Sequence, residues 1–519
     1  MKSKTKTQAI SAISVIYVML FVFILGCASD ETSPGDGGNQ TLPMDVSAIE
    51  NGLFDTTFGS SASGRREGFV TANFASGGAR YDGASGVALD LQGRIVVAGT
   101  TQSAAGDLDL MVLRYTSDGE LDPLFGTQRP GFFYHHSAAG GSNDEGAAVA
   151  IDQQRRIVVV GSSDSPGSNR DMTVWRLTEN GQLDTSFGAR NPAGGRLGYV
   201  VHAGAAGGSG ADHAAAVAID PLGRIIVAGY STNTRNNNDI AIWRFTQSGD
   251  LDLSFGDALP NGQRLGHFTL SSPAGGDGAD RATAIVIDLT GRILVAGYTT
   301  NAAGNQDAVI LRLNNQGLLD PQFGTQNGPV TRMGYIVRNS IAGGNQLDLA
   351  TCVLLDSQQR PVLIGHSSAG QNRTRLFVSR YDDQGEADLS FGDSFTGRFR
   401  TGTAIVSTTA LAGLDSATTG FIDSQDRVVV AGYRTPDLTT RIENMSLARL
   451  TFSGNIDTTF GDDAGNGQRR GYYSYARPSP GFGRFLAMRR DIQERAVLVG
   501  TGIGPTGTSD AFVWRLLLR

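Results

Sequence analysis

The most regular feature of the chain is a series of short apolar runs separated by polar and glycine-rich residues. Between Asp212 and Gly256 the runs are AAAVAID, IIVAGY and IAIWRF, and each is bounded by Gly, Asp or Asn. A fourth run, such as GYVV at 198–201, precedes the next copy of the pattern. Short runs rich in Val and Ile, with turn residues at their ends, predict strands rather than helices. The pattern therefore predicts units of four antiparallel strands joined alternately by short turns and longer loops.

This unit recurs along nearly the whole chain. The Gly that closes the second run is repeated at intervals of 67 or 68 residues, except for a first interval of 62, and it falls at Gly99, Gly161, Gly229, Gly297, Gly365, Gly432 and Gly500. Four-stranded repeats of this kind are typical of propeller blades. Seven copies predict an all-β chain that forms a seven-bladed β-propeller. An open solenoid of stacked copies is the competing architecture.

The two ends of the repeat array favour a closed ring. The seventh copy ends at its third run, FVWRLLLR, without the FG segment that follows in the other copies. The matching segment stands at the front, as LFDTTFG at 53–59 and GFVTANF at 68–74. We therefore expect the N-terminal strand to complete the last blade. The expected blades span about residues 82–143, 144–211, 212–279, 280–347, 348–414, 415–482, and 483–519 together with 51–76, within a propeller domain of residues 51–519.

Three segments of each copy resemble the delta-60 repeat family of bacterial β-propeller lipoproteins, whose role is uncharacterised. These segments are LDTSFG at 183–188 in the second copy, and DPLGRIIVAGY at 220–230 and DIAIWRF at 239–245 in the third. The resemblance covers roughly nine-tenths of the chain after the N-terminal region. It implies the propeller fold and no activity, because the family offers no catalytic motif. The second copy has Arg155 at the place of a turn Gly, the fifth has QQRPVLIGH at 358–366, and the seventh has Gly483 where the other copies have an Asp. We expect altered turns in these blades.

The first 27 residues have the order of a secretory signal. A basic start is followed by a largely apolar stretch and by ILGC, which ends at Cys27. This order resembles a bacterial lipobox and predicts a signal peptide at 1–27, with Cys27 lipidated after cleavage. An ordinary secretory signal or an uncleaved anchor helix is the alternative. Residues 28–50, rich in Gly, Ser, Pro, Asp and Thr, predict a flexible acidic linker.

The composition narrows the choice of compartment and partners. Acylation at Cys27 would attach the protein to a membrane, and Ala28 after the Cys favours the outer membrane by resemblance to sorted lipoproteins. The formal net charge is −7 and 18% of residues are charged, without a basic tract. Nucleic acid is therefore not an expected partner. Cys352 is the one Cys beyond the signal, so no intrachain disulfide is expected.

Each copy carries a charged set at its short-turn end. In the third blade it consists of Asp220, Arg224, Arg244 and Asp252. Arg244 alternates with apolar residues on a strand packed between blades, where an unpaired guanidinium would be costly. We expect bidentate pairing of Arg244 with Asp252 or Asp220. Because the set recurs in the copies, we interpret it as a structural ion-pair network rather than as an active site.

The long-loop end is where the copies differ. The residue after each repeat Gly carries a ring in blades 3 to 6, at Tyr230, Tyr298, His366 and Tyr433. Each ring can pack under its own loop, or the four rings can form a crescent that stacks a glycan or a peptide. The loop TNTRNNND at 232–239 adds polar groups to the same end.

No motif in the sequence names a catalytic group. There is no nucleophile elbow, phosphate-binding loop, calcium loop or closely spaced zinc-ligand pair, so no catalytic residue, metal or cofactor is predicted. The sequence predicts a cell-envelope lipoprotein that presents its propeller as a binding or scaffolding surface. The alternative is an extracytoplasmic hydrolase or lyase acting on a polysaccharide, because propellers can host such enzymes. Carboxylates converging in the central channel would favour the enzyme, whereas an uncharged channel with an aromatic rim would favour binding.

Overall fold

The computed structural model describes residues 53–59, 66–72, 77–126, 129–167, 169–370, 373–395, 399–407, 414–435, 444–465, 467–475, 484–503 and 508–518. The predicted signal at 1–27, Cys27, the linker at 28–50 and Gly483 lie outside these ranges. The chain divides into two compact units, Met1–Leu42 and Pro43–Arg519, and every described residue belongs to the second. All regular elements in the described ranges are β-strands.

Each blade is an antiparallel sheet of four strands, as predicted. In blade 3, β10 (Gly207–Ile219) pairs with β11 (Ile225–Asn233), β11 with β12 (Asn238–Phe245), and β12 with β13 (His267–Leu270). A turn of five residues, 220–224, joins β10 to β11, and a turn of four residues, 234–237, joins β11 to β12, so the second connection is not the longer loop that the sequence predicted. The first strand of each blade contains the small residues of the repeat, such as Ala214 to Ala216, which allow seven such strands to approach one another closely.

The other six blades follow the same order. From first to fourth strand, blade 1 has β2 (Gly77–Leu89), β3 (Ile95–Ser103), β4 (Leu108–Tyr115) and β5 (Phe132–His135), and blade 2 has β6 (Asp144–Ile151), β7 (Ile157–Ser165), β8 (Asn169–Leu177) and β9 (Tyr199–His202). Blade 4 has β14 (Arg281–Ile287), β15 (Ile293–Thr300), β16 (Gln306–Leu313) and β17 (Tyr335–Arg338), and blade 5 has β18 (Asp348–Leu355), β19 (Pro361–Ser368), β20 (Thr374–Arg380) and β23 (Thr403–Val406). Blade 6 has β24 (Leu414–Ile422), β25 (Val428–Thr435), β26 (Asn444–Leu450) and β27 (Tyr472–Tyr475), and blade 7 has β28 (Arg484–Arg490), β29 (Ala496–Ile503), β30 (Ser509–Leu516) and β1 (Phe69–Ala72). A small hairpin of β21 (Ser394–Phe395) and β22 (Phe399–Arg400) precedes β23.

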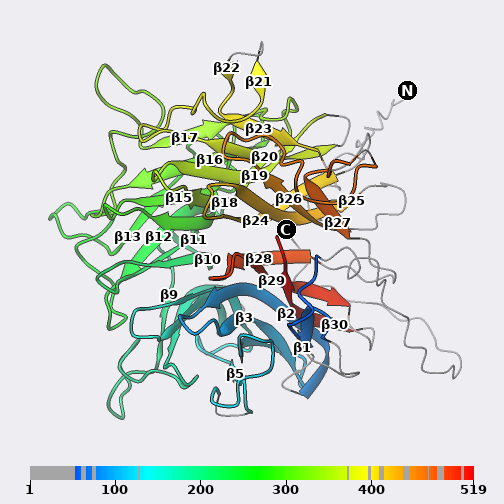
Figure 1. Cartoon of the computed structure of the whole chain (residues 1–519). Coiled ribbons are helices and arrows are strands. Elements are labelled where there is room, and N and C mark those ends of the chain that lie inside the picture. The colour runs from blue at the N-terminus through cyan, green and yellow to red at the C-terminus, as the bar shows by residue number, and fades with distance from the viewer. Residues whose placement is uncertain are drawn as a thin grey trace, which may run out of the picture. The chain divides into compact units, whose positions relative to one another are not determined.

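The seven first strands form a closed ring. Each contacts the first strand of the next blade, in the order β2, β6, β10, β14, β18, β24 and β28, and β28 in turn contacts β2. Figure 1 shows β10, β18, β24 and β28 near the middle of the ring, and outer strands such as β5, β17 and β23 at its periphery. The ring confirms the seven-bladed propeller and excludes the open solenoid.

The N-terminal strand closes the ring, as the repeat count predicted. β1 pairs with β30 from Phe69↔Trp514 to Ala72↔Ala511, so it is the fourth strand of the last blade. Ahead of β1, Asp55 accepts a hydrogen bond of 2.8 Å from Nε of Arg515. In blade 3 the same pair is formed by Arg244 and Asp252, eight residues apart in the chain. The N-terminal segment therefore supplies both the strand and the carboxylate that the last blade needs.

The hydrophobic core is divided among the seams between neighbouring blades. Between blades 3 and 4, for example, Ile226 and Ile242 pack against Val295 and Leu311, and all four are almost completely buried. Seven such clusters occur around the ring. Burial of one such side chain contributes about 1.5–3 kcal/mol. Each blade is thus stabilised by its two neighbours, which explains how one domain can exceed the usual size of a single core.

The altered turns expected in blades 2 and 5 are not found. Arg155 and Gln359 adopt φ values of 63° and 61°, close to the 72° of Gly223 at the same place in blade 3. In all three turns this residue donates its N–H, at 2.8 to 2.9 Å, to the carbonyl of the Asp that begins the turn. A non-glycine residue at positive φ costs about 1 kcal/mol. The hydrogen bonds of the turn and its Asp side chain outweigh that cost and keep the geometry unchanged.

Candidate functional site

The long-loop end of the ring carries seven facing pairs of side chains that vary from blade to blade. One member follows the Asp at the long-loop end of the first strand, which is Asp212 in blade 3 and is called the repeat Asp from here on, and the other follows the repeat Gly on the second strand. Strand pairing places them opposite each other, as Gly83–Thr100, Glu145–Ser162, His213–Tyr230, Arg281–Tyr298, Leu349–His366, Ser416–Tyr433 and Arg484–Thr501. Two residues further along the first strand, Ala215 and Thr283 already line the central cavity. These pairs therefore lie at the long-loop mouth of the channel.

The four predicted ring positions differ in exposure. Tyr298 and His366 are buried, with 2% and 7% of their surface exposed, whereas Tyr230 and Tyr433 are half-buried. Burial raises the pKa of Tyr298 to about 12 and lowers the pKa of His366 to about 4. The four rings thus do not form one continuous exposed crescent. Stacking of a ligand on the two half-buried rings, Tyr230 and Tyr433, stays a prediction.

A guanidinium from the next blade lies over each of the two half-buried rings. The guanidinium carbon of Arg281 lies 4.3 Å from the centre of the Tyr230 ring, and that of Arg484 lies 4.7 Å from the centre of the Tyr433 ring. On its own blade, Tyr230 stacks on His213 with ring centres 5.5 Å apart. The amide oxygen of Asn238, in the orientation that satisfies both groups, accepts bonds of 2.8 and 3.1 Å from Arg281. Arg281 is therefore positioned firmly beside the ring.

Blades 1 and 2 contribute further ionisable groups at the same end of the ring. Arg170 forms two hydrogen bonds with Glu145, at 2.6 and 2.9 Å. Burial raises the pKa of Glu145, and the charge of Arg170 counteracts part of that effect. Burial also raises the pKa of Tyr81, and the carboxylates of Glu145 and Asp82 raise it further. Tyr81 is nevertheless 36% exposed, so it presents its ring at the surface.

His213 lies between the Glu145–Arg170 pair of blade 2 and the Tyr230–Arg281 stack of blades 3 and 4. Its Nδ1 lies 3.3 Å from Oγ of Ser162, in the preceding blade. Burial lowers the pKa of His213 to about 4, and the charges of Arg170 and Arg281 lower it further, so the imidazole is neutral at pH 7. We define the rim cluster as Tyr81, Glu145, Arg170, His213, Tyr230 and Arg281. It combines two aromatic rings, two guanidinium groups, a carboxylate and a neutral imidazole across blades 1 to 4.

Most of the rim cluster was not predicted from the sequence, which singled out Tyr230 alone. A usable signal was present, because the residue after the repeat Asp varies as strongly as the residue after the repeat Gly. What the sequence did not show is that these two positions face each other in register. Perturbed pKa values of neighbouring groups at the mouth of a channel are typical of functional sites.

The charged set at the short-turn end is built into each blade. Arg244 is 2% exposed, and its Nε donates to Asp252 at 2.8 Å while Nη2 donates to Ser254 at 3.1 Å. Its third donor, Nη1, binds the backbone carbonyl of Asn315 in blade 4. Asp220 is engaged by Arg224, with Nε and Oδ2 2.5 Å apart. Contrary to our expectation, the Arg244–Asp252 pair is not bidentate, because Ser254 and the neighbouring blade take the other donors.

The same arrangement links successive blades around the ring. The guanidinium of each of these arginines also lies over the Phe of the FG pair, at 4.4 Å for Arg244 and Phe255. Equivalent stacking is found at Arg114, Arg176, Arg312, Arg380, Arg449 and Arg515. These groups have a repeated structural role, and their chemistry does not distinguish one blade from another.

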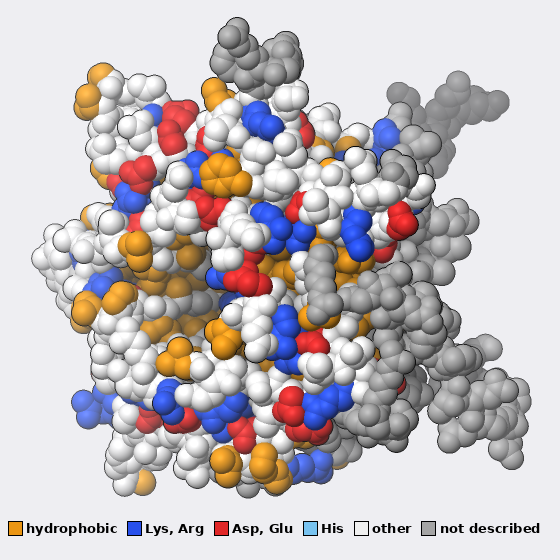
Figure 2. Space-filling model, in the orientation of Figure 1, with side chains coloured by type: hydrophobic (Ala, Val, Ile, Leu, Met, Phe, Trp, Pro, Cys, Tyr) orange, Lys and Arg blue, Asp and Glu red, His pale blue; other side chains and the backbone are white. Residues whose placement is uncertain are grey.

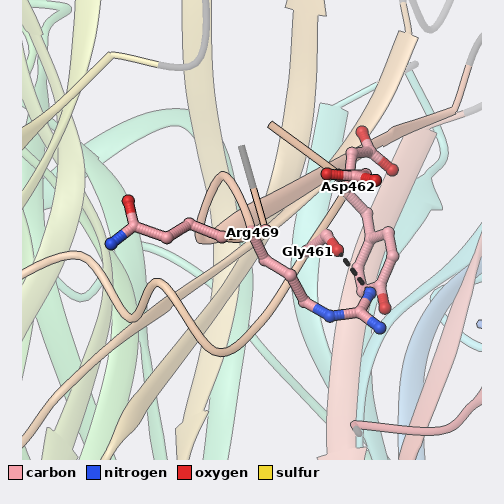
Figure 3. Close-up of a pocket in the computed structure, with 7 residues that line it drawn as sticks. Gly461, Asp462 and Arg469 are labelled. Carbon is pink, nitrogen blue, oxygen red and sulfur yellow. Dashed lines mark hydrogen bonds between the residues drawn. The ribbon is translucent and has the colours of Figure 1, made fainter. Parts of the chain in front are cut away.

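A pocket of about 440 Å³ opens beside blade 6 and is lined by Gly461, Asp462, Arg469 and Tyr473, among others. Figure 3 shows Arg469 folding back toward Gly461, to whose carbonyl it donates a hydrogen bond of 2.8 Å. The corresponding bond occurs in four other blades, from Arg196, Arg264, Arg332 and Arg400. Asp462 likewise accepts a bond from the Ser474 N–H, as Asp257 does from Thr269. The pocket is therefore part of the repeated loop construction.

The repeat Asp at the long-loop end caps a loop. Asp212, Asp280 and Asp348 accept backbone N–H bonds of 2.7, 2.6 and 2.8 Å from Gly204, Ser272 and Ser340. Each is fully buried, and burial raises its pKa. Among the described residues, no group of three or more His, Cys, Asp or Glu is placed to hold a metal ion.

The central cavity is lined by all seven first strands and has a volume of about 360 Å³. Its wall consists mainly of Ala, Val, Thr and other small or apolar side chains, including Thr351 and Cys352. Burial raises the pKa of the Cys352 thiol to about 11. The thiol is therefore protonated at neutral pH.

On the face turned to the viewer in Figure 2, hydrophobic side chains gather in a hollow between protruding polar and charged groups.

The comparisons with known proteins agree with this fold. Four segments, residues 93–125, 155–187, 223–255 and 290–323, match a family model described as a β-propeller domain of unknown function, DUF5122. They lie in blades 1 to 4, and each begins near the short turn and ends at the FG pair. The chain is therefore a β-propeller repeat protein. No curated protein matches its sequence.

Several solved structures are similar in outline. A polysaccharide lyase of family PL25, an ulvan lyase, is 10% identical over 83% of this chain and 90% of its own, with a TM-score of 0.38. A glucose dehydrogenase is 10% identical over 83% and 96%, with a TM-score of 0.37. A Dyadobacter fermentans protein of unknown function is 12% identical over 85% and 99%, with a TM-score of 0.36. No helix in the described part of the chain is long and apolar enough to span a membrane.

Proposed function

We propose that this protein is a cell-envelope lipoprotein of the delta-60 repeat type, and that its propeller binds an acidic glycan at the long-loop mouth of the channel. The observation that carries the proposal is the stack of His213, Tyr230 and Arg281, in which a half-buried ring lies beside a guanidinium held 4.3 Å away. Aromatic and neutral imidazole rings offer apolar contact to sugar rings, and a guanidinium binds a carboxylate with directional hydrogen bonds. Variation of these residues between blades suits a specific ligand, because a repeated structural role would keep them alike.

The proposal is tested by binding of acidic and neutral oligosaccharides to the wild type and to Arg281→Ala. A hydrogen bond to a charged group contributes about 1.5–3 kcal/mol, so we expect the variant to bind the acidic ligand about tenfold to a hundredfold more weakly. Arg332→Ala is the matched control, because Arg332 belongs to the loop set on the opposite end and pairs with Glu386. Equal binding by Arg281→Ala and the wild type, with both folded, would place the ligand elsewhere.

An extracytoplasmic lyase or hydrolase acting on a polysaccharide is the second candidate. It is favoured by the neutral His213, since a neutral imidazole can accept a proton. New reducing or unsaturated ends, released from an acidic polysaccharide by the wild type and not by His213→Ala, would establish it. Binding without release of such ends supports the scaffold instead.

Membrane attachment rests on the order of basic residues, apolar stretch and ILGC that ends at Cys27. We expect Cys27→Ser to block acylation, because only a thiol at this position can carry the lipid, and to release the protein to the soluble fraction or leave it unprocessed. Fractionation and intact mass measure both effects. Cys352→Ser is the matched control and should keep the membrane fraction unchanged. If Cys27→Ser retains the wild-type mass and membrane retention, the protein is not a lipoprotein.

A further inference from the structure

One residue on the first strand of the last blade breaks the pattern of the other six. Six residues after the repeat Asp, the chain has an apolar side chain in blades 1 to 6, at Ala88, Ala150, Ala218, Val286, Leu354 and Phe421. In blade 7 the corresponding residue is Arg489. At Leu354 and Phe421 this position packs into the seam with the following blade. An arginine there is not required by the construction of a blade.

Arg489 projects into the central cavity. It lines the cavity together with residues of all seven first strands, and it is the one charged side chain among the described residues of that lining. The side chain is accessible to solvent, yet the surrounding protein lowers its pKa through burial. Both observations fit a guanidinium that reaches into a narrow, water-accessible channel. The charge also acts on Cys352, two blades away, whose pKa it lowers against the larger effect of burial.

The guanidinium has few protein partners. Its Nη1 donates to the carbonyl of Met488, the preceding residue, at 2.9 Å, and this is its one hydrogen bond within the described part of the chain. A guanidinium has five N–H donors. No described carboxylate forms an ion pair with it, whereas the neighbouring Arg490 pairs with Glu494 and the buried Arg244 pairs with Asp252. The remaining donors are thus available to a molecule inside the channel.

We propose that Arg489 binds the carboxylate of a small molecule whose apolar part lies along the channel. A guanidinium in a confined site holds a carboxylate with two parallel hydrogen bonds, and the low dielectric of the wall strengthens them. The apolar wall favours an alkyl or ring-shaped body over a second charged group. The cavity volume of about 360 Å³ lies within the range of small-molecule pockets.

This site is separate from the rim cluster. Arg489 stands six residues after the place of the repeat Asp, whereas Glu145, His213 and Arg281 of the rim cluster stand one residue after it. Five residues of extended strand correspond to about 16 Å, so the two sites lie at different depths. Failure of glycan binding at the rim therefore leaves the channel site untouched, and the two are tested by different variants.

The experiment measures binding of hexanoate, with hexanol and inorganic phosphate as probes that lack either the charge or the apolar part. We expect saturable binding of hexanoate to the wild type and at least a tenfold loss in Arg489→Leu. Because Leu354 occupies the equivalent place in blade 5, Arg489→Leu should fold, and its melting temperature should rise rather than fall. Arg489→Lys keeps the charge but loses the paired donors, so its affinity should lie between the other two.

Arg490→Leu is the matched control, because Arg490 is adjacent in sequence and its charge is already paired with Glu494. It should bind hexanoate like the wild type. The proposal is overturned if the wild type shows no saturable hexanoate binding, or if Arg489→Leu binds as tightly. Equal binding of hexanol would show an apolar pocket without a role for the charge, and equal binding of phosphate would show an anion site without the proposed selectivity. Either result overturns the carboxylate assignment.

Discussion

Deletion of residues 53–72 is expected to abolish cooperative unfolding of the propeller and to cause aggregation. The deletion removes β1 and leaves the N–H and C=O groups of β30 unpaired at a free edge, which promotes association between chains. It also removes Asp55, whose carboxylate accepts from Arg515 at 2.8 Å and from Arg495 at 2.9 Å. Loss of one partner of a buried ion pair costs about 3–5 kcal/mol. That cost alone is a large part of a typical folding free energy of about 5–15 kcal/mol.

Size-exclusion chromatography and thermal unfolding measure this effect. Deletion of residues 28–50 serves as the control, since it shortens the chain without removing any strand of the ring, and it should unfold like the wild type. A point variant separates the ion pair from the strand: Asp55→Ala should destabilise the protein about as much as Asp252→Ala, its equivalent inside blade 3. A truncated protein that stays a soluble monomer with the wild-type melting temperature would show that β1 does not close the ring.

Arg244→Ala is expected to lower the free energy of unfolding by about 3–5 kcal/mol. The side chain is 2% exposed, and its three nitrogen atoms bind Asp252, Ser254 and the carbonyl of Asn315. Without the guanidinium, Asp252 keeps an unpaired charge on a side chain that is only 13% exposed. Burial alone would raise the pKa of Asp252, but hydrogen bonds from Ser254 and the charge of Arg244 hold it below its usual value. Arg244→Leu should be equally destabilising, because it restores packing but not the counter-charge.

Denaturant unfolding of the two variants beside Arg235→Ala provides the comparison. Arg235 lies in the same blade and pairs with Asp277 at 3.3 Å, but the two side chains are 71% and 85% exposed. Such a surface pair contributes about 0–1 kcal/mol. Since a lowered folded-state pKa stabilises above the unfolded pKa, the contribution of Asp252 should be lost as the pH falls through its folded pKa. A loss below about 1 kcal/mol in Arg244→Ala would mean that the guanidinium is solvated.

The local features of the fold could be read from the sequence because they depend on neighbouring residues. Alternation of short apolar runs and turn residues predicted four strands per copy, and β10 to β13 follow it. The offset between the chain ends predicted that the N-terminal strand completes the last blade, and β1 does so. The turn at Arg155 was predicted wrongly, since hydrogen bonds of the whole turn decide its φ and not the residue at one position.

The candidate sites depended on distances that no sequence pattern contains. The variable position after each repeat Gly was recognised at Tyr230, but its facing partner His213 and the guanidinium of Arg281 come from another strand and another blade. Burial separated Tyr298 and His366 from the two half-buried rings, because exposure depends on how the loops and neighbouring blades cover each ring. Arg489 departs in the sequence from the apolar residues at its place in the other copies, but only the structure shows that it lines the channel.

By itself, the sequence determined the β-strands, the seven-fold repeat and the closure of the ring, because these follow from side-chain periodicity and from counting copies. Only the tertiary structure decided which charges are paired. Arg244 and Arg489 are both arginines on strands of the same repeat, yet one lies 2.8 Å from a carboxylate and the other faces a channel with a single backbone partner. Electrostatic energy depends on distance and on burial, and both are set when seven blades from distant parts of the chain meet around one axis.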